Sequence, residues 1–189
     1  MSLHSDNARS MAKTAAVDAL TYLSNTEKHP AAPVCAIYGD EVFLKREVIA
    51  ALRSELDQGA DSEFSVTSFA GKDVEWRDVR DAVCTSTLFG GGRPVVFVDD
   101  ADSFVSNYRG ELEGFVAKPA AGVLILDVKT WPGNTRLAKA VAASGLAIEC
   151  KPPNESRANR WLAEHAQREH GVRLEPAAAD GLWELLPPE

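Results

Sequence analysis

Short apolar runs alternate with segments of helical periodicity over most of the chain. Apolar residues recur every four positions at Leu44, Val48, Leu52 and Leu56, which is typical of one face of a helix. The apolar runs are short enough to be buried strands, and they cover 34–38, 64–69, 95–98, 122–127 and 146–150. Because strand and helix alternate five times, the pattern predicts an α/β fold. We expect three αβα layers around a parallel five-stranded sheet.

Polar residues before the periodic segments predict where the helices begin. Asp40, Asp73 and Ser103 each stand ahead of such a segment and are good N-cap residues. The segment that follows Asp73 begins at Val74. An alanine-rich segment from Ala8 to Leu23 predicts one more helix ahead of the first strand.

The alternation stops at Pro152 and Pro153, which predict a domain boundary. Beyond it, Asn154 and Gly171 are the expected start and end of one helix, and Pro176 the start of another. Few residues remain in this part of the sequence to cover the apolar faces of these two helices. We therefore expect an αβα domain over 1–152, including the N-terminal helix, and a truncated helical domain over 153–189.

An apolar pair, Leu88 and Phe89, stands directly before three glycines and the third strand. Glycines favour tight turns, so the pair is expected at a loop tip or helix end. If the helix from Val74 ran on through Phe89, Leu88 would point roughly 160° and Phe89 roughly 100° away from its apolar stripe. That stripe is formed by Trp76, Val79, Ala82 and Val83. Packing onto the helix end and exposure to a partner both fit these residues.

Composition narrows the class of function. The formal net charge is −8 and the pI is about 5.1, which argues against a domain that grips nucleic-acid phosphates by itself. Cys35, Cys84 and Cys150 are scattered and odd in number, as in proteins of a reducing compartment. His165 and His170 are about 140° apart on a helix, so they do not share a metal-facing side. No apolar run approaches about 20 residues, and the expected location is the cytoplasm.

The turn after the first strand does not suit a nucleotide. An ATP site needs a glycine-rich loop with a Lys-Ser/Thr pair there, but the chain reads Gly39-Asp40-Glu41-Val42-Phe43-Leu44-Lys45. Two carboxylates stand where phosphates would lie and would repel them. Asp99 and Asp100 are expected to be strand-end or helix-cap acids rather than magnesium ligands. We expect no catalytic residue, no nucleotide-binding residue, no metal and no cofactor.

Several motifs together resemble the delta subunits of the bacterial DNA polymerase III clamp loader. The series begins with Tyr38-Gly39-Asp40-Glu41-x-Phe43-Leu44 after an apolar strand and spans most of residues 33–185. Its later members, in chain order, are Phe69-x-Gly71, Thr85-x-Thr87-Leu88-Phe89-Gly90, Leu137-x-Lys139-Ala140, and Pro152 followed by Trp161 and Gly171-Val172-x-Leu174.

The resemblance implies a fold of the AAA+ clamp-loader type, followed by the start of a helical lid domain. It implies a protein of DNA replication that binds and opens the sliding clamp, the beta subunit, for loading on primed DNA. Leu88 and Phe89 match the family's pair that inserts into the clamp. Such a subunit has no catalytic site of its own. It belongs to a DNA-directed DNA polymerase, a nucleotidyltransferase, and hence to the transferases.

The resemblance also implies partners and an alternative. The other loader subunits, gamma/tau and delta-prime, would bind the full-length protein through a collar domain that this sequence lacks. The fragment is therefore expected to be monomeric, to contact primed DNA only indirectly or weakly as a DNA-binding protein, and to avoid membranes. The alternative is another ATPase-inactive AAA+ scaffold, delta-prime-like or a replication adaptor. Against delta-prime, the chain lacks zinc-ligand cysteines, and Ser156-Arg157-Ala158 is not its Ser-Arg-Cys motif.

Overall fold

The computed structural model describes residues 16–57, 66–85, 93–175, 178, 179 and 181 of the 189-residue chain. The chain divides into two compact units, Met1–Cys150 and Lys151–Glu189. Each unit is described separately below.

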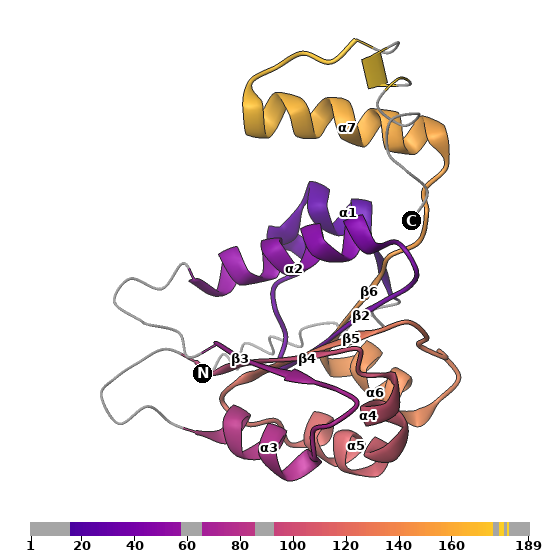
Figure 1. Cartoon of the computed structure of the whole chain (residues 1–189). Coiled ribbons are helices and arrows are strands. Elements are labelled where there is room, and N and C mark those ends of the chain that lie inside the picture. The colour runs from indigo at the N-terminus through magenta and orange to yellow at the C-terminus, as the bar shows by residue number, and fades with distance from the viewer. Residues whose placement is uncertain (1–15, 58–65, 86–92, 176–177, 180, 182–189) are drawn as a thin grey trace, which may run out of the picture. The chain divides into compact units, whose positions relative to one another are not determined.

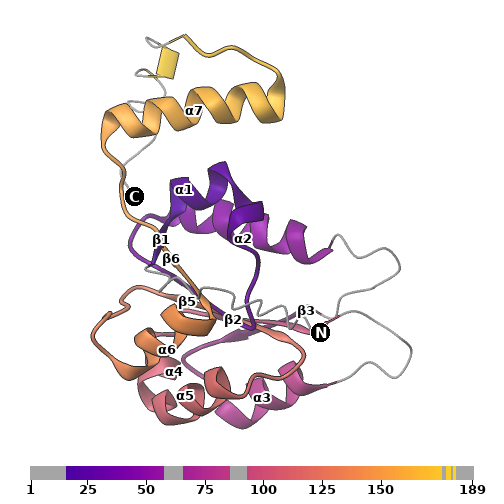
Figure 2. The same ribbon diagram turned by 180° about the vertical axis from the view of Figure 1, so that it is seen from behind.

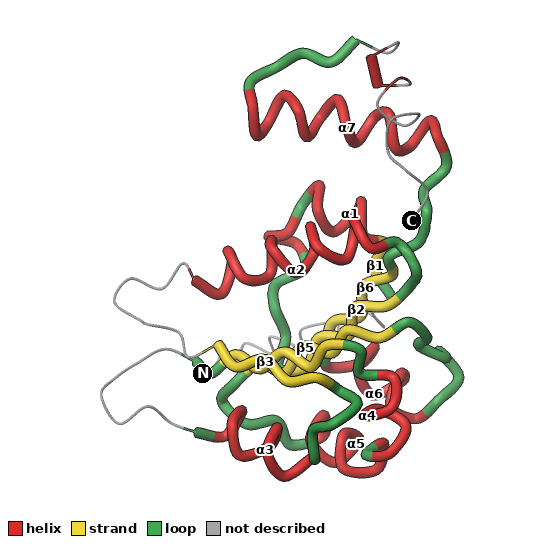
Figure 3. Tube along the Cα trace, in the orientation of Figure 1, coloured by secondary structure: helices red, strands yellow, loops and turns green. Residues whose placement is uncertain are grey.

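The first unit is built on a parallel six-stranded sheet with the order β1-β6-β2-β5-β4-β3. Figure 3 shows these strands as one layer between helices. Four strands, β2, β4, β5 and β6, are buried along nearly their whole length, as their unbroken apolar runs predict. The strands are β1 (Val17–Asp18), β2 (Val34–Tyr38), β3 (Val66–Ala70), β4 (Val95–Asp99), β5 (Val123–Val128) and β6 (Leu146–Glu149).

Helices cover both faces of this sheet, so the predicted α/β, αβα architecture is confirmed. On one face lie α1 (Ala19–Ser24) and α2 (Val42–Asp57), as Figures 1 and 2 show. On the other face lie α3 (Trp76–Cys84), α4 (Asp102–Asn107), α5 (Arg109–Ala117) and α6 (Arg136–Ser144). A short 3-10 helix, Thr26–Lys28, follows α1.

The alternation of side chains along β4 joins the sheet to both helical layers. Val96 and Val98 belong to the large core cluster, together with Phe104 and Leu112 of α4 and α5. Phe97 points to the other face, where the Arg53 guanidinium of α2 lies 4.4 Å from its ring centroid. The strand therefore buries apolar side chains in both directions, as its continuous run predicts.

The sheet has one strand more than the five predicted. The extra strand, β1, pairs through Val17 and Asp18 with Ile148 and Glu149 of β6. Both residues fall in the segment 8–23 that was expected to be helical. Helix α1 instead begins at Ala19, where the Asp18 carboxylate accepts hydrogen bonds from the amides of Leu20 and Thr21. Residues 8–15 lie outside the described residues.

Three predicted N-caps are displaced by one or two residues. Helix α2 begins at Val42, so Glu41 and not Asp40 precedes it. Helix α3 begins at Trp76 after Glu75, while the Asp73 amide bonds to the Ala70 carbonyl in a turn. Helix α4 begins at Asp102, one residue before Ser103. At Asp40 and Asp73 the chain bends or turns before the helix begins, whereas Ser103 lies inside the first turn of α4.

The second unit contains one long helix, α7 (Glu155–His170). Its predicted ends are confirmed. The Asn154 side chain accepts a hydrogen bond from the Arg157 amide at 2.9 Å, and Gly171 ends the helix with φ of 65° in the left-handed region. Trp161 is buried, and the His165 ring stacks on it with 4.7 Å between centroids. The second predicted helix, from Pro176, lies largely outside the described residues.

Candidate functional site at the carboxyl ends of the strands

The turn after β2, where an ATP-binding protein would hold phosphates, contacts the end of β6 instead. The Cys150 amide donates to the Tyr38 carbonyl at 2.6 Å, and the Glu41 amide donates to the Cys150 carbonyl at 3.2 Å. Between them, Gly39 is buried with φ of 125°. A Cβ atom at Gly39 would lie 1.9 Å from the Cys150 oxygen, so only glycine fits there. The Glu41 amide is therefore already bonded to a carbonyl of the protein.

Lys45 of α2 is also engaged internally. Its Nζ atom donates to Asp127 Oδ1 at 2.7 Å and to the Val128 carbonyl at 2.8 Å. The Lys45 side chain is only 12% exposed and the Asp127 side chain 24%. An ammonium with a carboxylate and a carbonyl as partners is satisfied without a phosphate.

Asp102 fastens the loop after β5 to the start of α4. Its carboxylate accepts hydrogen bonds from the amides of Lys129 at 2.9 Å and Thr130 at 3.1 Å, and from the Thr130 hydroxyl at 3.2 Å. Burial alone would raise the pKa of Asp102, but these hydrogen bonds outweigh it, and the pKa lies below its ordinary value.

The pKa of Asp99 is shifted in the opposite direction to that of Asp102. It is the last residue of β4, as predicted for a strand-end acid. Partial burial and the neighbouring Asp127 carboxylate raise its pKa, and Arg53 only partly opposes them. Asp100 follows in the turn with φ of 49°. Carboxylates therefore line this edge of the sheet, which makes it unfavourable for phosphate.

Metal binding and thiol chemistry are the other possibilities in the described part of the chain. No group of three or more His, Cys, Asp or Glu side chains there is arranged to hold a metal ion. The three cysteines are free thiols, of which Cys84 is exposed. Burial raises the pKa of Cys35 and of Cys150 to about 12, so both thiols stay protonated at neutral pH.

The predicted clamp-binding pair, Leu88 and Phe89, lies outside the described residues. The structure does describe where the preceding helix ends. Helix α3 ends at Cys84, and Thr85 has extended backbone with φ of −65° and ψ of 113°. The helix therefore does not continue through Phe89, and the angles derived from that condition do not apply.

Both described flanks of segment 86–92 are held by hydrogen bonds. Before it, the Thr85 hydroxyl donates to the Asp81 carbonyl at 2.6 Å. After it, Arg93 Nε donates to the Ala121 carbonyl at 2.7 Å, and β4 begins two residues later at Val95. The segment that carries Leu88 and Phe89 thus lies in the chain between the end of α3 and the start of β4.

Comparison with known proteins gives a likeness of structure. No family model and no curated protein sequence matches the chain. The Bacillus subtilis DNA clamp loader delta protein (YqeN) matches with a TM-score of 0.66 and 21% identity over 89% of this chain. The match covers 51% of the delta protein, so this chain spans about half of its length.

Two other solved structures match more distantly. Domain III of the Thermotoga maritima replication initiation protein DnaA gives a TM-score of 0.44 and 16% identity over 86% of this chain and 73% of that one. A variant of RuvB from Thermotoga maritima gives a TM-score of 0.43 and 13% identity over 86% of this chain and 51% of the RuvB chain.

The first of these matches establishes the fold. The chain has an α/β fold similar to that of the clamp loader delta protein, as its motifs suggested. Among the residues described by the structure, none of the helices has the length and apolar character needed to cross a bilayer.

Proposed function

We propose that this chain is the N-terminal part of a clamp-loader delta-type subunit. It would bind the ring-shaped sliding clamp and open it for loading on primed DNA, without catalysis of its own. The observation that carries the proposal is the likeness to a clamp loader delta protein over 89% of the chain. The motif series from Tyr38 to Leu174, which resembles the same family, supports it from the sequence. A non-catalytic role agrees with the turn at Gly39, whose contacts are internal.

The clamp-binding residues in this proposal are Leu88 and Phe89. The pair would form an apolar wedge that enters a hydrophobic pocket on the clamp. Apolar anchors in such pockets carry much of the affinity of protein interfaces. The residues that flank the segment, Thr85 and Arg93, each donate a side-chain hydrogen bond to a backbone carbonyl of the first unit.

The remaining assignments follow from the same proposal. Unit Lys151–Glu189 would be the beginning of the lid domain, and the first unit the αβα domain. Gamma/tau and delta-prime subunits would be partners of the longer protein. The net charge of −8 favours at most weak or indirect contact of this part with primed DNA.

The test is a binding titration of the sliding clamp from the same organism with the Leu88→Ala/Phe89→Ala variant. Burying each side chain contributes roughly 1.5–3 kcal/mol. The double variant should therefore bind roughly 10²–10⁴-fold more weakly, at about 1.4 kcal/mol per decade. Its thermal unfolding should stay close to that of the unmodified chain, because an exposed wedge would contribute nothing to the core.

A matched control is Val66→Ala/Val172→Ala. These two side chains are 49% and 54% exposed, so the control removes exposed apolar surface outside segment 86–92. It should bind the clamp as well as the unmodified chain. A Leu88/Phe89 variant that unfolds much earlier but binds normally when folded would contradict the wedge. A folded, unmodified chain with no affinity for the clamp would leave the ATPase-inactive scaffold as the function.

A further inference from the structure

Cys150 is the last residue of the first unit, and the turn at 38–41 holds it from two sides. Its amide donates to the Tyr38 carbonyl at 2.6 Å, and its carbonyl accepts from the Glu41 amide at 3.2 Å. Cys150 itself is fully buried. The next residues, Lys151, Pro152 and Pro153, begin the second unit. Where the chain leaves the first unit, both the amide and the carbonyl of Cys150 are thus hydrogen-bonded to the turn.

We propose that the 38–41 turn is a nucleotide-independent anchor for the linker between the two units. In ATP-binding αβα domains the corresponding turn, after a buried strand and before a helix, is free to wrap phosphates. Here the turn wraps the end of β6 instead, and so fixes the point at which the chain leaves the first unit. The inference concerns residues of the first unit alone and does not rest on clamp binding.

Gly39 is the residue on which the anchor depends. Its φ of 125° is a conformation that side-chain-bearing residues rarely adopt. A Cβ atom there would lie 1.9 Å from the Cys150 oxygen and 2.6 Å from the Cys150 carbonyl carbon, both backbone atoms. Neither can rotate away as a flexible side chain would. Gly39 therefore permits the close approach that the two hydrogen bonds need.

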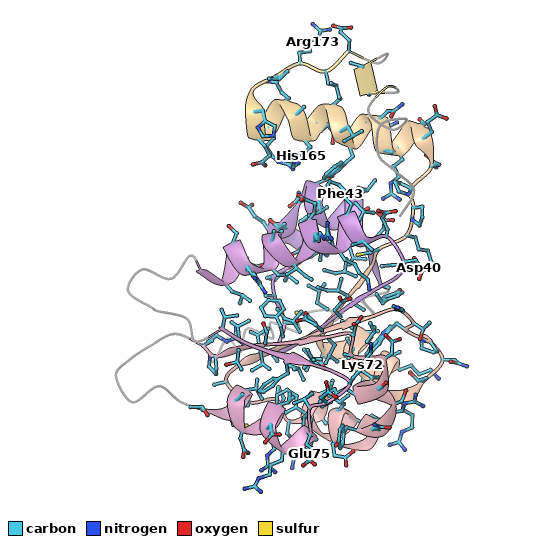
Figure 4. The ribbon with its side chains drawn as sticks, in the orientation of Figure 1. Asp40, Phe43, Lys72, Glu75, His165 and Arg173 are labelled. Atoms are coloured by element: carbon cyan, nitrogen blue, oxygen red, sulfur yellow. The ribbon has the colours of Figure 1, made fainter. Side chains whose placement is uncertain are left out.

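The surroundings of the turn keep it in this state without a ligand. Lys45, one helical turn into α2, bonds to Asp127 and Val128 of β5 and holds the start of the helix against the sheet. Asp40 is exposed at the turn, as Figure 4 shows, and adds a negative charge where a phosphate would approach. The anchor is therefore built from protein groups alone.

Hydrogen exchange at two amides gives the first test. In the unmodified chain the Glu41 and Cys150 amides should be protected, because both are bonded within the anchor. In Gly39→Ala, both should exchange roughly tenfold faster or more, since the displaced turn loses at least one backbone hydrogen bond. The control is Gly133→Ala, where a Cβ meets nothing within 4 Å and the rates should not change. The proposal would be overturned if both amides of the unmodified chain exchanged as fast as amides exposed to solvent.

Distance measurements between spin labels give the second test. Labels at Lys139→Cys in α6 and Gln167→Cys in α7 would sit on exposed positions of the two units, in a Cys84→Ser background that removes the exposed native thiol. Gly39→Ala should broaden the distance distribution, while Gly133→Ala should not. Magnesium-ATP should leave the distribution of the unmodified chain unchanged.

The proposal can fail in several distinct ways. A folded Gly39→Ala variant with an unchanged distribution would overturn it, and so would narrowing of the distribution by magnesium-ATP. If Gly39→Ala does not fold, Glu41→Pro offers a second variant, since it removes one amide donor at the start of a helix, where proline is tolerated. It should broaden the distribution in the same way, and an unchanged width would again refute the anchor.

Discussion

The ammonium of Lys45 lies 2.7 Å from the Asp127 carboxylate and joins the second turn of α2 to the end of β5. The two residues are 82 positions apart in the chain. Because the Lys45 side chain is 12% exposed and Asp127 24%, the pair is shielded from much of the solvent. The Lys45 ammonium thus joins helix α2 to strand β5 within the first unit.

Replacing one member of this pair should be costly. Lys45→Met leaves the Asp127 carboxylate and the Val128 carbonyl without their donor, so we expect a loss of about 1.5–3 kcal/mol in the free energy of unfolding. Lys45→Met/Asp127→Ala should lose less than the sum of the two single changes, because no unpaired charge remains. Chemical denaturation at neutral pH measures the free energy of unfolding of the unmodified chain, of Lys45→Met, of Asp127→Ala and of the double variant.

The matched control is the pair of Arg77 and Asp81 on α3. Their side chains are 80% and 56% exposed and their charged atoms are 3.8 Å apart. Arg77→Met should cost about 0–1 kcal/mol, as for other surface pairs. Equal losses in Lys45→Met and Arg77→Met would show that shielding of the Lys45 pair does not strengthen it.

Asp102 should make stability depend on pH in the direction typical of a hydrogen-bonded acid. Its pKa is lowered in the folded protein, so its contribution is present above the ordinary value of about 3.9 and is lost as the pH falls through the lowered value. Asp102→Asn should therefore destabilise the chain at neutral pH. The difference from the unmodified chain should disappear in strong acid, and a pH-independent difference would contradict the assignment.

Asp99 should show the opposite dependence. Its pKa is raised, first by burial and then by Asp127, so the ionised carboxylate is disfavoured in the folded protein. Asp99→Asn should stabilise the chain at neutral pH, and the gain should vanish as the pH falls below about 3.9. Denaturation series at several pH values compare this variant with Asp102→Asn. A loss of stability at neutral pH in Asp99→Asn would refute the prediction.

Local patterns in the sequence were enough for most of the fold. The run Val95–Val98 predicts a buried strand because both its faces are apolar, and Asn154 and Gly171 predict the ends of α7 because their caps are local. The strand β1 escaped prediction because two residues carry no periodicity, and its stability comes from pairing with β6. Asp73 looked like a cap but lies in a turn, because a tertiary fold can shift a helix start by a residue or two.

The candidate site was less accessible to sequence reasoning. The absence of a phosphate loop after β2 could be seen directly, and the acids there argued against ATP. The bond from Lys45 to Asp127 could not be seen, because no local pattern connects residues 82 positions apart. Nor could the approach of Cys150 to Gly39, although a glycine after a buried strand is a signal of close backbone contact.

Two glycines of the first unit should respond to alanine in opposite directions. Gly114 lies inside α5, is exposed, and leaves open space within 4 Å of an added Cβ. Gly114→Ala should therefore raise the free energy of unfolding by about 0.5–1 kcal/mol, because alanine loses less backbone entropy in a helix.

At buried Gly122, before β5, an added Cβ would lie 2.4 Å from the Val83 oxygen and 2.8 Å from the Pro94 oxygen. Gly122→Ala should lower the free energy of unfolding by about 1–3 kcal/mol, since backbone atoms must move. Thermal and urea unfolding of both variants give the comparison. If both variants were more stable, the backbone around Gly122 at the end of α3 would have room for a Cβ atom. If both were less stable, a Cβ atom at Gly114 would meet other atoms of the protein in solution.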